Sequence, residues 1–213
     1  TIRTVTVRGA HLSWRRGGTG RTVIWGHGLT GSMAGEEQFS LVDHARLAGT
    51  FDLIRYDARG HGSSTSTPDL AGYTWDQMAL DQLGLADAFG VGGYVAAGAS
   101  LGAATAIEAA LAAPDRVSGL VLVIPPTAWE TRAEQAGRYE QMASIAERRG
   151  VEPLVAGLDA APIPDPLAGD AERRARSEAN LRSWDIDRLA TVFRGAGGAD
   201  LPSRESIATI SAP

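Results

Sequence analysis

The sequence contains no cysteine and no lysine, and these two absences narrow the chemistry that its side chains can perform. Without cysteine the chain can form no disulfide and offers no thiolate nucleophile. Its cysteine content therefore does not indicate whether it works in an oxidising or a reducing compartment. All 20 basic residues are arginines, which excludes a lysine Schiff base. Covalent catalysis is therefore left to serine, threonine, aspartate or glutamate.

Long apolar runs and basic stripes are missing as well. The longest apolar stretches, such as GLVLVIPP at 119–126, are far short of the ~18 residues that a membrane-spanning helix requires. The 25 acidic residues outnumber the arginines and give a net charge of −5, without the basic stripe that a phosphate backbone would need. We therefore expect a soluble, cytoplasmic protein that binds neither membranes nor nucleic acid.

What the chain does have is an alternation of strand-like and helix-like segments. With 213 residues, 44% of them hydrophobic, it is long enough for one main core. Apolar runs predict strands at 2–7, 11–16, 21–25, 51–57, 93–99 and 116–124, the last of them buried on both faces. Helical spacing predicts helices over about 39–47, 75–89 and 101–113, the second preceded by Thr74 and Gln77 at capping-box spacing. The alternation indicates an α/β fold on a mostly parallel sheet flanked by helices.

The pattern changes after the strand at 116–124. Helix-like sequence follows at 130–150 and again from 171 to about 194, with a Pro-rich stretch at 161–169 between them. A helical insertion after a sheet strand suggests a cap over the carboxyl edge of the sheet, where ligands bind in open α/β folds. We therefore divide the chain into a core at 1–124, a helical cap at 125–200 and a return segment at 201–213.

Ser100 lies within VAAGASLGAATAIEAALAA (95–113), between a predicted strand and a predicted helix. A tight strand-to-helix turn exposes a serine to substrate and places it beside the free N–H groups at the start of a helix. Residues two before and two after the serine come close together in such a turn, so Gly98 and Gly102 avoid a collision. A simple contact between small residues of a helix and a sheet would explain these glycines but not the serine.

Three segments together resemble the α/β-hydrolase family: WGHGLTGS (25–32), YDARGHGSS (56–64) and GASLG (98–102). The resemblance implies that Ser100 is the nucleophile and that the N–H groups of Leu29 and Leu101 form the oxyanion hole. It also implies a structural role for Asp57 and Arg59, which are expected to brace their loop. Neither a cofactor nor a metal ion is expected.

The family order places an acid and a histidine after the serine, but all four histidines here precede Ser100. His27 and His61 lie in the two glycine loops, and the resemblance gives neither of them the role of base. We expect the C-terminal strands of the fold to lie beyond Pro213, with the acid and the histidine supplied there or by another chain, such as a C-terminal fragment. The strand at 116–124 would then be an exposed sheet edge within these residues.

The interpretation is a cofactor-free serine hydrolase that cleaves a carboxylic ester or lactone through an acyl-enzyme on Ser100. Esterases, enol-lactone hydrolases and perhydrolases resemble the chain equally well, and carbon–carbon bond hydrolysis stays open. An alternative from another class is a non-catalytic receptor for small molecules on the same scaffold. Candidate substrate-binding residues are Gly28, Trp129 and Tyr139.

Overall fold

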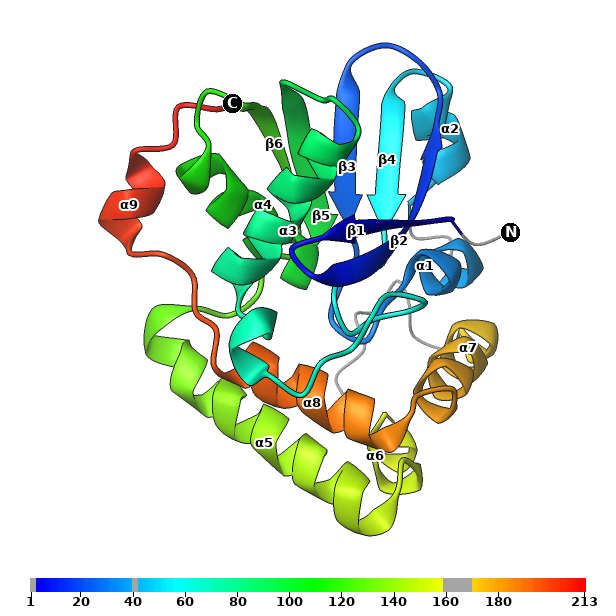
Figure 1. The fold of residues 1–213 in the computed structure, drawn as a ribbon. Helices are drawn as coiled ribbons and strands as arrows, with labels where there is room; N and C mark the ends of the chain where they lie inside the picture. The colour runs from blue at the N-terminus through cyan, green and yellow to red at the C-terminus, as the bar shows by residue number, and fades with distance from the viewer. Residues whose placement is uncertain (1–2, 40–41, 159–169) are drawn as a thin grey trace.

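The computed structural model describes residues 3–39, 42–158 and 170–213. Six strands in the described residues form one sheet with the order β1-β2-β4-β3-β5-β6 (Figure 1). The strands are β1 (Arg3–Val7), β2 (Ala10–Gly17), β3 (Thr22–Gly26), β4 (Asp52–Tyr56), β5 (Tyr94–Ala99) and β6 (Val117–Val123). They match the six predicted strands to within a residue or two at each end.

The sheet is antiparallel at one side and parallel in the rest. β1 and β2 form a hairpin, and β2 pairs antiparallel with β4. β3 pairs parallel with both β4 and β5, and β5 pairs parallel with β6. Because parallel strands end at the same edge of a sheet, the loops that follow β3, β4 and β5 meet there.

Helices cover both faces of the sheet. α3 (Trp75–Ala88) and α4 (Leu101–Ala112) pack on the face that holds the main core. α1 (Met33–Phe39) and α2 (His44–Ala48) lie on the other face, which carries the apolar cluster of Val23, Trp25, Leu53 and Ala97. Successive strand residues point to opposite faces, so Ile24 joins the first cluster while its neighbours join the second.

Two local predictions were wrong. The single helix predicted over about 39–47 is two short helices, and the second begins where the Asp43 side chain accepts the N–H of Arg46. The capping box at α3 does not form: the Thr74 hydroxyl donates to the Ala71 carbonyl, and Gln77 accepts from Arg8. In both places side-chain hydrogen bonds decide what apolar spacing alone does not.

β6 is the edge strand of the described sheet, so the burial on both faces that its apolar run indicates is not seen, whereas the expected exposed sheet edge is. Val121, Leu122 and Val123 are 47%, 39% and 37% exposed, and Ile124 after them is 73% exposed. The apolar run has strand composition, but β6 pairs only with β5 among the strands that the structure describes. The Leu120 N–H donates to the Pro213 carbonyl at 2.8 Å, so the end of the return segment lies beside this edge.

Helices also follow β6, as predicted. They are α5 (Arg132–Arg149), α6 (Glu152–Gly157), α7 (Ala171–Arg182) and α8 (Ile186–Gly197), and α9 (Arg204–Ala208) lies in the return segment. In Figure 1, α5 and α8 lie side by side across the end of the molecule toward which the arrows of β3 and β4 point. The Arg188 guanidinium of α8 donates to the carbonyls of Gly60 and Ser64 at 2.7 and 2.8 Å, which ties α8 to the loop after β4. The Pro-rich stretch at 161–169 falls outside the described residues.

Candidate active site

Ser100 stands between β5 and α4 in a strained backbone conformation, with φ 51° and ψ −110°. A positive φ costs a residue with a side chain roughly 1–3 kcal/mol and persists only where the surroundings fix it. Two hydrogen bonds do so here: the Ser100 N–H donates to the Val123 carbonyl at 2.9 Å, and the Ser100 carbonyl accepts the Ala104 N–H at 3.0 Å. The strain therefore marks the turn that sequence spacing predicted for a nucleophile.

Three glycines, not two, make this turn possible. A Cβ on Gly98 would lie 2.5 Å from the carbonyl carbon of Gly102, as the sequence pattern predicted. A Cβ on Gly102 would lie 2.1 Å from the carbonyl oxygen of Gly26, the last residue of β3. Sequence reasoning missed Gly26 because its partner is far away in the chain. The contact brings α4 against β3 and so brings Ser100 to the loop that follows β3.

That loop, residues 27–32, lies directly beside Ser100. It is called the oxyanion loop below, after the role that the resemblance to the family implies for Leu29. The Gly102 N–H donates to the His27 carbonyl at 3.1 Å, and a Cβ on Gly28 would be 3.7 Å from the Ser100 Cβ. In the described part of the chain, the N–H groups of Leu29 and Leu101 have no hydrogen-bond acceptor. Leu101 is the first residue of α4, so its N–H also carries the partial positive charge of a helix start.

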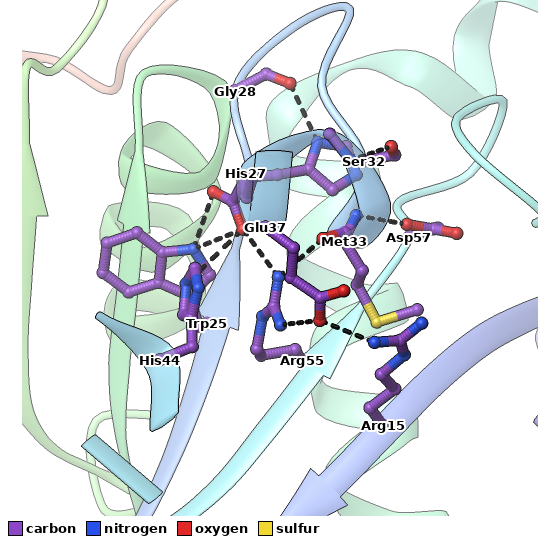
Figure 2. A network of polar contacts seen from close by, with 12 residues as sticks. Arg15, Trp25, His27, Gly28, Ser32, Met33, Glu37, His44, Arg55 and Asp57 are labelled. Carbon is purple, nitrogen blue, oxygen red and sulfur yellow. Dashed lines mark hydrogen bonds and ion pairs between the residues drawn. The ribbon is translucent and has the colours of Figure 1, made fainter. Parts of the chain in front are cut away.

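Both ends of the oxyanion loop are anchored to the core (Figure 2). At its start, the His27 Nε2 accepts the Ala58 N–H at 3.0 Å, so the ring proton sits on Nδ1 and is donated to the Gly28 carbonyl at 2.8 Å. Just after its end, the Met33 N–H donates to the Asp57 carboxylate at 2.7 Å. Asp57 also accepts the Ser63 N–H at 2.9 Å, so it braces both glycine loops as expected.

A second set of contacts holds α1, which follows the oxyanion loop, against the sheet. The Arg55 guanidinium donates to the Met33 carbonyl and to Glu37, and the Trp25 indole N–H donates to Glu36 (Figure 2). Arg55 is only 5% exposed, so these bonds form largely out of water and are correspondingly strong. Arg59 forms a comparable pair on the other side, with both of its bonds to the buried Asp81.

The histidines that precede Ser100 are engaged elsewhere, and none has Ser100 as a hydrogen-bond partner among the described residues. His27 uses both ring nitrogens, as described above. His61 is fully buried, bonds the Arg59 carbonyl through Nδ1, and packs on the Trp184 ring at 5.5 Å. Burial lowers the pKa of His61 to about 3, which keeps the ring neutral. Among the described residues, no hydrogen bond therefore links a histidine to Ser100.

A cavity of about 750 Å³ opens above Ser100 between the oxyanion loop and helices α5 to α8. Its walls are mainly apolar, with Leu29, Met142, Ile145 and Phe193 among them. Polar atoms come from Thr30, Gln141, Ser177 and Asn180, and no described residue in the lining carries a charge. Ligand sites of enzymes commonly combine apolar walls with a few polar groups in this way.

The structure separates the three predicted substrate-binding residues. Tyr139 lines the Ser100 cavity and stacks on Phe193 with ring centroids 6.0 Å apart. Gly28 lies against Ser100 at the base of the site. Trp129 is not among the cavity residues: its indole N–H donates to the Pro202 carbonyl, and Arg204 lies over its ring at 4.2 Å. Trp129 therefore anchors the return segment, and we do not retain it in the site.

A second hollow of about 660 Å³ lies on the α1 and α2 side of the sheet, bordered by Arg15, Arg55 and His44. Ser100 is not in its lining, and its three arginines are already paired: Arg15 and Arg55 with Glu37, and Arg16 with Asp52. Within the described ranges, no group of three or more acidic or histidine side chains is arranged to hold a metal ion. A search of the same residues found no helix of the length and apolarity needed to cross a bilayer.

Comparison with known proteins agrees with this geometry. A family model described as the alpha/beta hydrolase fold matches residues 21–149. The chain is 33% identical over 141 residues to the dihydrolipoyllysine-residue acetyltransferase component of the acetoin cleaving system of Cupriavidus necator, covering 66% of this chain and 36% of that protein. It is 43% identical over 81 residues to N-formylmaleamate deformylase of Pseudomonas putida, covering 38% of this chain and 30% of that protein.

Among solved structures, a hydrolase from Pseudomonas aeruginosa superposes with a TM-score of 0.76 at 28% identity, covering 93% of this chain and 73% of the other. The matched part of the chain spans about a third of the length of these curated relatives, at 36% and 30%. The family match covers more than half of the chain and includes the oxyanion loop, the loop after β4 and the turn at Ser100. The chain therefore belongs to the α/β-hydrolase family.

Proposed function

We propose that this protein is a serine hydrolase that cleaves a carboxylic ester or lactone through an acyl-enzyme on Ser100. The observation that carries the proposal is the strained turn at Ser100, which lies at the cavity beside two N–H groups without acceptors. Strain of this size is stored where function requires it. We further propose the division into a core at 1–124, a cap at 125–200 and a return segment at 201–213.

In the proposed reaction, the Ser100 Oγ attacks the carbonyl carbon of the substrate and its proton passes to a histidine base. The carbonyl oxygen becomes an anion that accepts hydrogen bonds from the N–H groups of Leu29 and Leu101. Collapse of this intermediate breaks the bond to the alcohol oxygen, which takes the proton from the histidine. Water then attacks the acyl-enzyme by the same steps and releases the acid.

We assign the histidine and its partner acid to residues outside the 213 of this chain. The described histidines are held in other hydrogen bonds or lie away from Ser100 in the fold, and His61 stays neutral because it is fully buried. The oxyanion donors act independently of the base, and removal of one such donor typically costs about 3–4 kcal/mol of transition-state stabilisation.

The cavity favours an uncharged substrate. Its described lining has no arginine that could pair with a carboxylate on the substrate. Burying an unpaired charge is costly. We therefore propose a neutral ester or lactone whose acyl group packs on Met142, Ile145 and Phe193.

A second candidate is a receptor that binds a small molecule in the same cavity without turning it over. The observation in its favour is that no described side chain is placed to take the proton of Ser100. In that case the strain at Ser100 would have no catalytic purpose, so we place this function second.

A fluorophosphonate probe tests the two functions on the full-length protein. We expect one probe molecule per protein, located on Ser100 by peptide mass spectrometry and absent in Ser100→Ala. Ser63→Ala is the matched control, because Ser63 is an exposed serine in the neighbouring loop after β4. Labelling that persists in Ser100→Ala, or a wild-type protein that binds small esters but neither reacts nor hydrolyses them, would contradict the hydrolase and favour the receptor.

A further inference from the structure

We propose that Asn180 of α7 is a positioning residue that holds the oxyanion loop in its working conformation from the cap side. The inference rests on the proposed function, because it concerns the N–H of Leu29 as a donor to the oxyanion. The Asn180 Nδ2 donates to the Thr30 carbonyl at 3.0 Å, a bond between residues 150 positions apart.

The bond from Asn180 acts on a residue, Thr30, whose backbone conformation is strained. Its φ is 61°, in the left-handed region, where a β-branched residue is a genuine outlier. Such a conformation is unfavourable and relaxes unless neighbouring groups oppose it. The peptide that joins Leu29 to Thr30 carries the Leu29 carbonyl and the Thr30 N–H. A change in the backbone angles of Thr30 would therefore move this peptide and, through the backbone of Leu29, displace the preceding peptide, which carries the Leu29 N–H.

In the part of the chain that the structure describes, the core anchors the oxyanion loop at its two ends. His27 is held by Ala58 and Gly28, and Met33 is held by Asp57. Between these points the backbone bond from the Gly31 N–H to the Gly28 carbonyl closes a turn but does not tie it to another element. Within the described ranges, Asn180 is the side chain that bonds the backbone of the middle of the loop.

Asn180 also lines the Ser100 cavity, so it touches both the loop and the space for the substrate. α7 approaches α1 closely here, since a Cβ on Gly35 would lie 3.8 Å from the Asn180 Oδ1. The ion pairs of Arg182 with Glu152 and Glu178 at 3.0 Å, in the same part of α7, lie at the surface and contribute little. The bond to Thr30 therefore couples the position of α7 to the geometry of the oxyanion hole.

Two substitutions in the full-length protein test this role. Asn180→Leu keeps the branched shape of the side chain and removes the donor, while Asn180→Asp keeps the size and places a carboxylate against the Thr30 carbonyl. We expect kcat for a neutral nitrophenyl ester to fall by about 10-fold to 100-fold in both, less than for complete loss of an oxyanion donor, with KM changed by less than threefold. Inhibition by an alkylboronic acid, whose adduct on Ser100 places an oxygen in the oxyanion hole, should weaken by the same factor.

Glu178→Gln is the matched control, because Glu178 lies on the same helix and outside the cavity. A double-mutant cycle with Thr30→Gly separates positioning from general loss of packing. Glycine adopts φ near +60° without penalty, so the effect of Asn180→Leu on kcat should be several-fold smaller in the Thr30→Gly protein.

Three results would overturn the inference: an unchanged kcat in both Asn180 variants, an effect confined to KM, or an equal loss with and without Thr30→Gly. A different result would refute the proposed function: a wild-type protein whose Ser100 does not react with the fluorophosphonate probe.

Discussion

The close contact between Gly102 and Gly26 makes a quantitative prediction about stability. Replacing Gly102 with alanine places a Cβ 2.1 Å from the Gly26 oxygen and 2.4 Å from its carbonyl carbon, whereas ordinary contact begins at 3.4 Å. Both atoms are backbone in the middle of the sheet, so no side chain can rotate away, and α4 and β3 must separate by roughly an ångström. We expect the free energy of unfolding to fall by about 3 kcal/mol, at the upper end of the range for overpacked cores.

Gly137 in α5 provides the matched control, because it is also a helical glycine but has nothing within 4 Å of its Cβ position. There alanine should stabilise the protein by about 0.5–1 kcal/mol through helix propensity alone. Guanidinium denaturation followed by circular dichroism measures both variants, and the midpoint of Gly102→Ala should fall by roughly half a molar. If Gly102→Ala unfolds at or above the wild-type midpoint, close backbone approach is not what requires glycine at this position.

Three further predictions concern charge and protonation. Arg59→Met should destabilise the fold by about 3 kcal/mol in denaturation experiments, at the lower end of the range for a broken buried pair, because the buried Asp81 loses two bonds from Arg59 but keeps one from Arg8. Because the pKa of His61 is lowered in the folded protein, the unfolded chain binds more protons between pH ~6.5 and 3. The free energy of unfolding should therefore fall on acidification through this range, by up to ~1.4 kcal/mol per pH unit. In His61→Asn the fall should be less steep. Burial also lowers the pKa of His44, so part of the pH dependence of stability should remain in the His61→Asn protein. A neutral butyrate ester should be hydrolysed at least tenfold faster than the matching hemisuccinate, and Gln141→Arg at the cavity should narrow this ratio; equal rates in the wild type would refute the uncharged-site argument.

Local sequence was sufficient to predict the turn at Ser100. Gly98 and Gly102 are neighbours of the serine in the chain, so the collision that they avoid depends on one strand and one helix that follow each other directly. The bracing role of Asp57 was expected from the resemblance to the family rather than from local spacing, and its bonds to Met33 and Ser63 agree with it. Gly26 could not be identified this way, because nothing in its own segment shows which helix will lie against it.

The composition of a segment was a poorer guide where burial depends on neighbours. The run at 116–124 reads as a fully buried strand, yet Ile124 is 73% exposed because β6 lies at the edge of the described sheet. Trp129 and Tyr139 are both aromatic residues of the predicted cap, but only Tyr139 faces the cavity. The direction in which a side chain points depends on how its helix or turn packs, and the identity of a single aromatic residue does not indicate this direction.

The sequence by itself determined the order of strands and helices, the strand-to-helix turn that carries Ser100, and the exclusion of lysine and cysteine chemistry, because each depends on residue types or on spacing within one or two adjacent elements. Only the tertiary structure decided which N–H groups lie beside Ser100, which side chains line its cavity, and that Asn180 reaches Thr30. The physical reason is that these contacts join segments up to 150 residues apart. Their geometry follows from how the elements pack against one another, which no local pattern records.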